Sequence, residues 1–248
     1  MSATLRQIRI GTSGWSYRSW RGPFFPEKLA YRLHLDFYAG RFTTTELNGV
    51  FYRTPTEEAV RSWAEQTPRG FIFAWKASRF ITHWKRLSEN SKNSLELMES
   101  RLALLRGKVG PILFQLPPHF KKERERLAAF FKMLNKKRRY AFEFRHPSWY
   151  DDAIIDLLRD HNMALCISDH HDAPSPWVAT AQHIYVRGHG PAGHYRDHYS
   201  AKRLVEWAQW LLRMERRGHF AFVYFDNDQK SAAPQDAAKL IDVLGGAS

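Results

Sequence analysis

Short apolar segments recur along the chain, and each is followed by a stretch with apolar residues at helical spacing. The segments are rich in Ile, Val, Phe, Tyr and Thr, which favour strands. They span residues 7–11, 43–47, 71–76, 111–116, 140–144, 164–168, 183–187 and 220–225. Dividing 248 residues among eight units gives 31 residues each, close to what a parallel β-α-β crossover requires. The pattern predicts eight parallel strands with helices between them.

Polar residues mark where several of the helices begin and end. Thr54 and Ser148 each precede an acidic residue by three positions, which is the spacing of a capping box. Ser200 precedes a long apolar stripe at helical spacing, and Gly218 follows that stripe. We expect Thr54, Ser148 and Ser200 to cap helices and Gly218 to end one.

Eight such units predict an α/β fold, a closed (β/α)8 barrel of the TIM type, as a single domain over residues 1–248. The alternative is an open, doubly wound sheet, because a strand count does not prove closure. The turn from Gly11 to Gly14 lacks the third glycine of a dinucleotide-binding loop, which disfavours that alternative. No linker or low-complexity stretch divides the chain.

Composition restricts the class of protein further. Apolar residues make up 44%, which is typical of a packed domain and excludes disorder along the whole chain. The net charge of +13 describes a basic protein and favours an anionic partner. The single cysteine, Cys166, excludes an internal disulfide and is expected in the core. No run of 18 apolar residues occurs and residues 1–9 contain no export signal, so we expect a cytoplasmic protein without membrane contact.

Ligands of such barrels bind at the carboxyl ends of the strands, where this sequence places charged residues. Alternation along the strands points six charged side chains inward. They are the cations Lys76, Arg145 and Arg187 and the carboxylates Glu46, Glu143 and Asp169. Charges inside a barrel are costly unless they are paired. The cluster therefore predicts a site for a polar ligand, with a purely structural salt-bridge network as the alternative.

The ligand interpretation assigns a role to each charge. Lys76, Arg145 and Arg187 would bind a small anion such as a phosphate or carboxylate, through charge-assisted hydrogen bonds. The catalytic candidates are two residues that would exchange protons and two that would orient them. The first pair is Glu46 and Glu143, and the second pair is Asp169 and His189.

Further ligand-binding candidates are aromatic or polar residues at or just beyond the predicted strand ends. They are Trp15, Tyr17, Asn48, Tyr52, Gln115, His146, Trp149, Asn227 and Asp228. The aromatic members can stack on a ring or base of the ligand. Alternatively, they pack as lids on the rim of the barrel.

A bound metal is not expected. Suitable ligand types are present, but three cations in the same mouth would repel a divalent ion. The adjacent residues His170, His171 and Asp172 are not expected to converge on one point. No cofactor is named by the sequence, and no nucleophile elbow of the G-x-S-x-G type is present.

A strongly basic segment, residues 121–139, carries nine Lys or Arg side chains against two Glu. We expect its helix to end on the face opposite the proposed mouth and to act as a solvated surface. The alternative function is a nucleic-acid-binding, possibly nuclease-like, barrel that uses basic surface and mouth aromatics.

Distinctive runs occur along nearly the whole chain. They include Ile10-Gly-Thr-Ser-Gly-Trp-Ser-Tyr17, Phe73-Ala-Trp-Lys76, Glu143-Phe-Arg-His146, Tyr185-Val-Arg-Gly-His-Gly190 and Tyr224-Phe-Asp-Asn-Asp228. Together they resemble the YecE-like family, domain of unknown function 72. The resemblance implies a TIM-type barrel and no settled activity. Members often read Val-Glu-x-Asn-x-Thr-Phe-Tyr near the second strand, whereas this chain has Thr45-Glu-Leu-Asn-Gly-Val-Phe-Tyr52.

Overall fold

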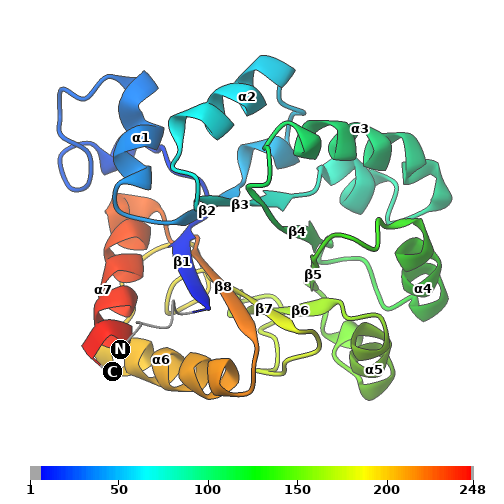
Figure 1. The fold of residues 1–248 in the computed structure, drawn as a ribbon. Coiled ribbons are helices and arrows are strands. Elements are labelled where there is room, and N and C mark those ends of the chain that lie inside the picture. Colours follow the sequence, from blue (N-terminus) through cyan, green and yellow to red (C-terminus); the bar gives the residue numbers. More distant parts are fainter. Residues whose placement is uncertain (1–6, 247–248) are drawn as a thin grey trace.

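Eight parallel strands form a ring at the centre of the computed structural model, which describes residues 7–246 (Figure 1). The strands are β1 (Ile8–Thr12), β2 (Thr44–Leu47), β3 (Ile72–Lys76), β4 (Val109–Gln115), β5 (Tyr140–Glu143), β6 (Ala164–Ser168), β7 (His183–Gly188) and β8 (Phe220–Phe225). Their order is β1-β8-β7-β6-β5-β4-β3-β2. The predicted (β/α)8 architecture is confirmed. The prediction that residues 1–9 contain no export signal concerns mainly residues 1–6, which lie outside the described residues.

Helices surround the strand ring on its outer side (Figure 1). They are α1 (His34–Ala39), α2 (Glu57–Gln66), α3 (Lys92–Ala103), α4 (Arg124–Met133), α5 (Asp152–Asp160), α6 (Ala201–Arg216) and α7 (Ala232–Gly246). Residues 169–182, which connect β6 to β7 and are all described, contain no α-helix. The expectation that every strand is followed by a helix is therefore wrong at this connection. Between residues 7 and 246, no helix is long and apolar enough to cross a membrane.

Two of the three predicted helix caps lie at other residues. The Thr56 hydroxyl, not that of Thr54, accepts the capping bond from Ala59 N at the start of α2. Asp151 caps α5 by accepting from Ile154 N, because Ser148 lies in a separate turn (Pro147–Trp149). The prediction for Ser200 is confirmed. Gly218, with φ of +87°, follows the end of α6 as expected.

The core has two layers, because strand side chains alternate between the helices and the barrel axis. Outward residues such as Phe114 and Phe142 pack against the helices. The axis is filled by a second buried cluster that includes Leu113, Tyr185 and Tyr224. Cys166 lies in this inner cluster, fully buried as expected. Burial raises the pKa of its thiol well above the usual value, so it is not an activated nucleophile.

The ring closes between β1 and β2 through close backbone contacts. Gly14 N donates to Glu46 O at 2.7 Å, and the Tyr38 hydroxyl links the two strands by accepting from Thr12 N and donating to Thr44 O. A Cβ atom on Gly11 would lie 2.1 Å from the carbonyl oxygen of Thr44. This approach leaves space only for glycine, so Gly11 is a requirement of closure.

Candidate functional site

A buried network of charged side chains lies at the carboxyl ends of the strands, and Arg187 of β7 is at its centre. The Arg187 guanidinium is fully buried and donates to Glu46 of β2 at 2.9 and 3.1 Å and to Glu143 of β5 at 2.9 Å. It also donates to Asp226, just after β8, at 2.7 Å. One side chain therefore joins the ends of four strands. Each of its three nitrogens already has a carboxylate acceptor, which leaves little capacity for a ligand.

Arg145 forms a second, more peripheral part of the network. Its Nε donates to Glu143 Oε1 at 2.6 Å, and its Nη1 donates to the Tyr195 hydroxyl at 3.1 Å. The His189 Nε2 faces both Arg145 (3.2 Å) and Arg187 (3.0 Å), so it accepts from both guanidinium groups. Burial and the charge of Arg187 hold the pKa of His189 well below its usual value. His189 is therefore a neutral residue that positions the two arginines.

Asp169 anchors the connection that follows β7. Its carboxylate accepts from His189 N at 2.7 Å and from the Tyr199 hydroxyl at 2.5 Å. Burial raises its pKa, although these hydrogen bonds oppose the shift. Asp169 thereby ties both ends of the segment from 189 to 199 to the residue that follows β6, and its predicted role in orienting Glu46 and Glu143 stays a prediction.

Glu46 and Glu143 are fully buried, yet both are held in the ionised form. Burial alone would raise the pKa of Glu46, but Arg187 and Lys76 more than offset it and lower the value. Arg145 and Arg187 do the same for Glu143 and lower its pKa strongly. Glu46 also accepts from the Ser13 and Tyr185 hydroxyls at 2.5 and 2.6 Å. Both carboxylates are thus committed to binding cations.

Lys76 is the exception among the three predicted cations. Its side chain is buried, with 5% exposure, and Nζ donates to Asn48 Oδ1 at 3.1 Å. The Phe51 ring lies 4.5 Å from Nζ. Within residues 7–246, no carboxylate lies within ion-pair distance of this ammonium. Burial and repulsion by Arg187 lower its pKa to about 8, so it is mostly charged at neutral pH.

Asp226 belongs to the network, although it is not among the residues that the sequence predicts for the site. The strand-end candidates chosen there were Asn227 and Asp228. Alternation along β8 places Phe222 and Tyr224 in the inner cluster, and the next residue of that series is Asp226. The signal was therefore present in the sequence.

Four other predicted residues come together beside the network. Trp15, Tyr17, Asn48 and Tyr52 line one cavity of about 630 Å³ between the ends of β1 and β2 and the start of α2. Trp63 of α2 completes an aromatic wall, with its ring 5.5 Å from that of Trp15. Because Asn48 also binds Lys76, the cavity borders the one cation of the network that lacks an ion pair.

Three predicted mouth residues have other surroundings. Trp149 is buried, stacks on Phe144 with ring centroids 4.7 Å apart and donates to Phe120 O, so it packs in the outer core. Asn227 is buried and donates to Asp236 and to Asp197 O. The His146 ring accepts from Ser148 N within its own turn. Of the two interpretations of the aromatic residues, packing therefore holds for Trp149, whose buried ring cannot stack on a ligand.

Gln115 and Asp228 lie at the strand ends as expected. Gln115 is half-buried at the end of β4 and is in register with Glu143. Asp228 is half-buried, and its backbone oxygen accepts from Trp20 Nε1 at 3.2 Å. Burial, with the neighbouring charge of Asp226, raises the pKa of Asp228 to about 6. The Asp228 carboxyl group therefore titrates closer to neutral pH than an ordinary aspartate does.

Tyr195 was not predicted, although it covers part of the network. Its ring lies 5.0 Å from that of His189 and 5.4 Å from that of His170. It adopts a φ of +63°, in the connection after β7. No strand or helix periodicity reaches this segment, so the sequence carried no signal for its position.

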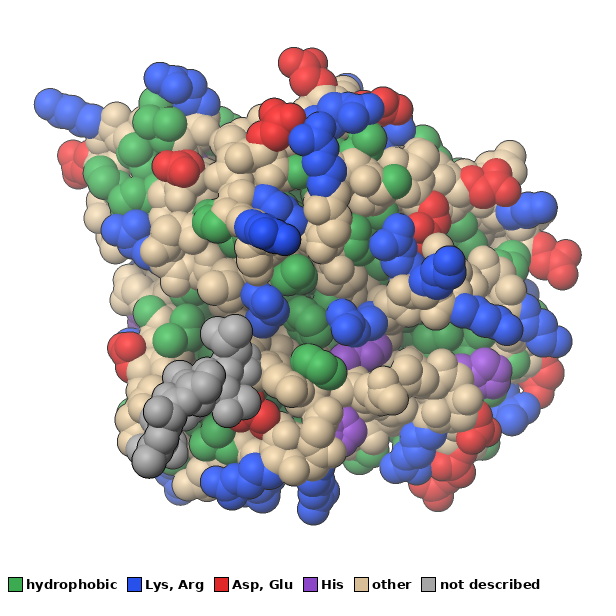
Figure 2. All heavy atoms as spheres, in the orientation of Figure 1, with side chains coloured by type: hydrophobic (Ala, Val, Ile, Leu, Met, Phe, Trp, Pro, Cys, Tyr) green, Lys and Arg blue, Asp and Glu red, His purple; other side chains and the backbone are tan. Residues whose placement is uncertain are grey.

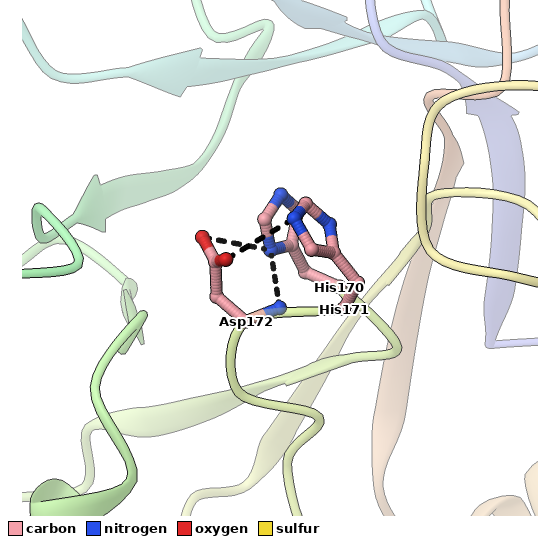
Figure 3. Close-up of side chains that lie close together, drawn as sticks. All are labelled: His170, His171 and Asp172. Atoms are coloured by element: carbon pink, nitrogen blue, oxygen red, sulfur yellow. Dashed lines mark hydrogen bonds and ion pairs between the residues drawn. The ribbon is translucent and has the colours of Figure 1, made fainter.

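His170, His171 and Asp172 do converge, contrary to expectation. One ligand-type atom from each lies within 4.8 Å of the others. The close-up shows the three side chains facing one another (Figure 3). The tight turn after β6 folds the two imidazole rings together, with centroids 4.3 Å apart. Adjacent residues on a strand point to opposite faces and cannot reach one ion, but adjacent residues in a tight turn can.

Basic side chains are distributed widely over the surface. In Figure 2, Lys and Arg side chains are spread across the whole visible face, with fewer acidic ones among them. The basic helix α4 leads into the amino end of β5, so it ends at the opposite end of the barrel from the charged network. The charge at the end of this segment, residues 132–139, is therefore separate from the candidate site.

Comparisons with known proteins agree on the fold. The family profile described as "Protein of unknown function DUF72" matches residues 9–248. A DUF72 family protein of Thermotoga maritima MSB8 is 26% identical, with a TM-score of 0.86 over 96% of this chain and 99% of that one. One from Enterococcus faecalis V583 is 20% identical, with a TM-score of 0.79 over 97% and 98%. SacUVDE is 10% identical, with a TM-score of 0.59 over 97% and 99%. No curated protein matches the chain.

Proposed function

Because this chain belongs to the DUF72 family, whose description assigns no function, we propose one from the site itself. The chain binds a small anionic or phosphorylated ligand at the carboxyl face of the barrel and acts on it by acid–base chemistry. The observation that carries this proposal is the state of Lys76. Glu46, Asp226 and Glu143 act on this ammonium only from beyond ion-pair distance, and a ligand anion would give it the direct contact that it lacks.

The geometry supports a different role for each of the three cations. Lys76 would contact the anion directly, next to the aromatic cavity that would hold the remainder of the ligand. Arg145 would be the second contact, because its Nη1 is bound only to the Tyr195 hydroxyl, which a ligand can displace. Arg187 is saturated by three carboxylates and would position the others.

Acid–base chemistry at neutral pH needs one group that is ready to give a proton and one that is ready to take it. Lys76, with a pKa of about 8, is charged and can donate. Asp228, with a pKa of about 6, is largely ionised and can accept. Glu46 and Glu143 are predicted to exchange protons, but their lowered pKa values favour a role in holding the arginines.

Replacing Lys76 by methionine is the test of this proposal. We expect at least a tenfold loss of affinity for the anion, together with a gain in stability of about 1–3 kcal/mol at pH 7, because a buried charge is removed. The ligand is found by thermal shift and native mass spectrometry with sugar phosphates, nucleotides and carboxylic acids, at low and high salt. Binding that resists salt, and that is lost in Lys76→Met, is the expected result.

The pH dependence gives an independent check on the same variant. In the unfolded chain, lysine keeps its proton up to a pH of about 10.4, whereas folded Lys76 loses it near 8. The wild type should therefore gain stability relative to Lys76→Met as pH rises between these values. The exposed Lys202 serves as the control, since Lys202→Met should change neither property. A Lys76→Met protein that keeps its anion affinity would refute the proposal.

A second candidate function, binding of single-stranded nucleic acid, is favoured by one surface feature. Tyr52 and Trp84 are 64% and 63% exposed, and the Arg79 guanidinium lies over both rings, at 5.8 and 5.3 Å. Exposed aromatic and cationic groups of this kind stack on bases.

A Trp84→Ala substitution should weaken oligonucleotide binding by about 1–3 kcal/mol if this surface stacks on a base. Fluorescence anisotropy with a labelled single strand, repeated across a salt series, measures the effect. Affinity that falls steeply with salt but is indifferent to Trp84→Ala would indicate non-specific adhesion instead.

A cytoplasmic location is also proposed, in keeping with the single cysteine, and cell fractionation tests it.

A further inference from the structure

Two imidazoles and one carboxylate, from His170, His171 and Asp172, face one another at the start of the connection from β6 to β7 (Figure 3). His171 Nε2 lies 3.1 Å from Asp172 Oδ1, and His170 Nδ1 lies 3.5 Å from Asp172 Oδ2. Zinc binds nitrogen and oxygen ligands at about 2.0–2.2 Å in tetrahedral geometry, which places neighbouring ligand atoms about 3.3 Å apart. Each of these two nitrogens lies at about that spacing from one oxygen of the carboxylate, and one ligand atom from each residue lies within 4.8 Å of the others.

The hydrogen bonds around the cluster determine which ring nitrogens carry a lone pair. His171 Nδ1 contacts Gly193 O at 3.0 Å, and since a carbonyl oxygen only accepts, this nitrogen holds the proton. His171 Nε2, which faces Asp172, is then free to act as a ligand. His170 Nδ1 accepts from Asp172 N at 3.2 Å, so it carries its lone pair at this nitrogen, and a bound ion would replace that hydrogen bond. Lone pairs of two rings and a carboxylate thus converge, and the arrangement lacks a positive charge at its centre.

The opposite loop is shaped to hold this geometry. Gly193 has a φ of +72°, and a Cβ atom there would lie 2.5 Å from both Asp169 O and His171 N. Only glycine allows the loop to approach closely enough for its carbonyl to orient the His171 ring. The neighbouring ring of His194 lies 4.0 Å from that of His171, centroid to centroid, and offers a further imidazole on the solvent side.

From this geometry we propose that the cluster binds one transition-metal ion of the zinc class. His170, His171 and Asp172 are three ligands, and water completes the coordination. Arg145 and Arg187 are each paired with carboxylates, which reduces their repulsion of a metal ion. The site is separate from Lys76 and does not depend on the function proposed above.

Zinc chloride is the probe, titrated into untagged, chelator-treated protein by isothermal titration calorimetry. We expect one equivalent to bind with a Kd below about 10 µM, as for a three-ligand protein site. Cobalt chloride gives a second readout, because four-coordinate Co²⁺ shows strong visible absorption bands. Asp172→Asn and His171→Ala should each weaken zinc binding at least about tenfold. Both side chains are partly exposed, so both variants should fold.

The control is His119→Ala, which removes an exposed histidine outside the cluster and should leave the zinc affinity unchanged. Lys76→Met should also leave it unchanged, so this result and that of the anion screen are independent. Two outcomes would overturn the proposal. One is no binding at 100 µM zinc, about tenfold above the expected Kd, which would leave the cluster as a hydrogen-bonded turn only. The other is binding that survives both cluster substitutions.

Discussion

An Arg187→Met protein is expected to lose at least about 4 kcal/mol of stability, and thus much of the 5–15 kcal/mol that a folded domain typically has. The substitution leaves three carboxylates, from Glu46, Glu143 and Asp226, without their shared partner inside the barrel. Breaking a buried ion pair from one side is costly because the remaining charge stays buried. Urea unfolding followed by circular dichroism measures the loss, and the soluble yield reports a complete failure to fold.

The defect should depend on pH in a defined direction. In the wild type, the lowered pKa values of Glu46 and Glu143 contribute stability that is present at neutral pH and is lost as pH falls below their unfolded values of about 4.3. Arg187→Met should therefore approach the wild type in acid. Arg203→Met, which breaks an exposed pair with Glu206, should cost less than about 1 kcal/mol. Equal urea midpoints for Arg187→Met and the wild type would show that the network does not stabilise the fold.

Gly11→Ala is expected to have the next largest effect. The new methyl group would lie 2.1 Å from the Thr44 carbonyl and 2.9 Å from the Tyr38 hydroxyl. Both neighbours are fixed, since Tyr38 is fully buried and Thr44 is in β2, so the two strands must separate. Overpacking of this kind costs about 1–3 kcal/mol, and the loss of the Tyr38 bonds adds about 1–3 kcal/mol.

Gly70→Ala is the matched control, because a Cβ atom there would meet nothing within 4 Å. It should be neutral or slightly stabilising. Both variants are compared by thermal unfolding, and hydrogen exchange of the β1 and β2 amides locates the damage. If Gly11→Ala and Gly70→Ala unfold at the same temperature, closure of the ring does not require the close contact at Gly11.

Much of the barrel could be predicted because buried parallel strands are continuous apolar runs that the sequence displays directly. The bounds of β6 and β8 agree with their predicted ranges. Alternation also identified Glu46, Glu143, Arg145 and Arg187 as neighbours, since a strand fixes the direction of each side chain.

The parts of the site on irregular segments could not be predicted in the same way. The positions of Tyr195 and Asp172 depend on loops whose backbone is held by contacts distant in sequence, such as that between His171 and Gly193. Trp149 was misplaced because position after a strand does not tell whether a ring turns to the mouth or to the helices. The caps at Thr56 and Asp151 lie two and three residues beyond the expected ones, which is an error typical of element ends.

The contacts of Arg187 have a consequence for how the chain folds. Its partners Glu46 and Glu143 are 141 and 44 positions away in sequence, so the charges meet only after both halves of the barrel have formed. Contacts of such long range slow folding, and larger chains pass through partly assembled intermediates. In any intermediate that lacks β2 or β7, unpaired charges would draw water into this end of the interior. Water would then leave this end of the interior only when β2 and β7 are both in place and their charges have paired.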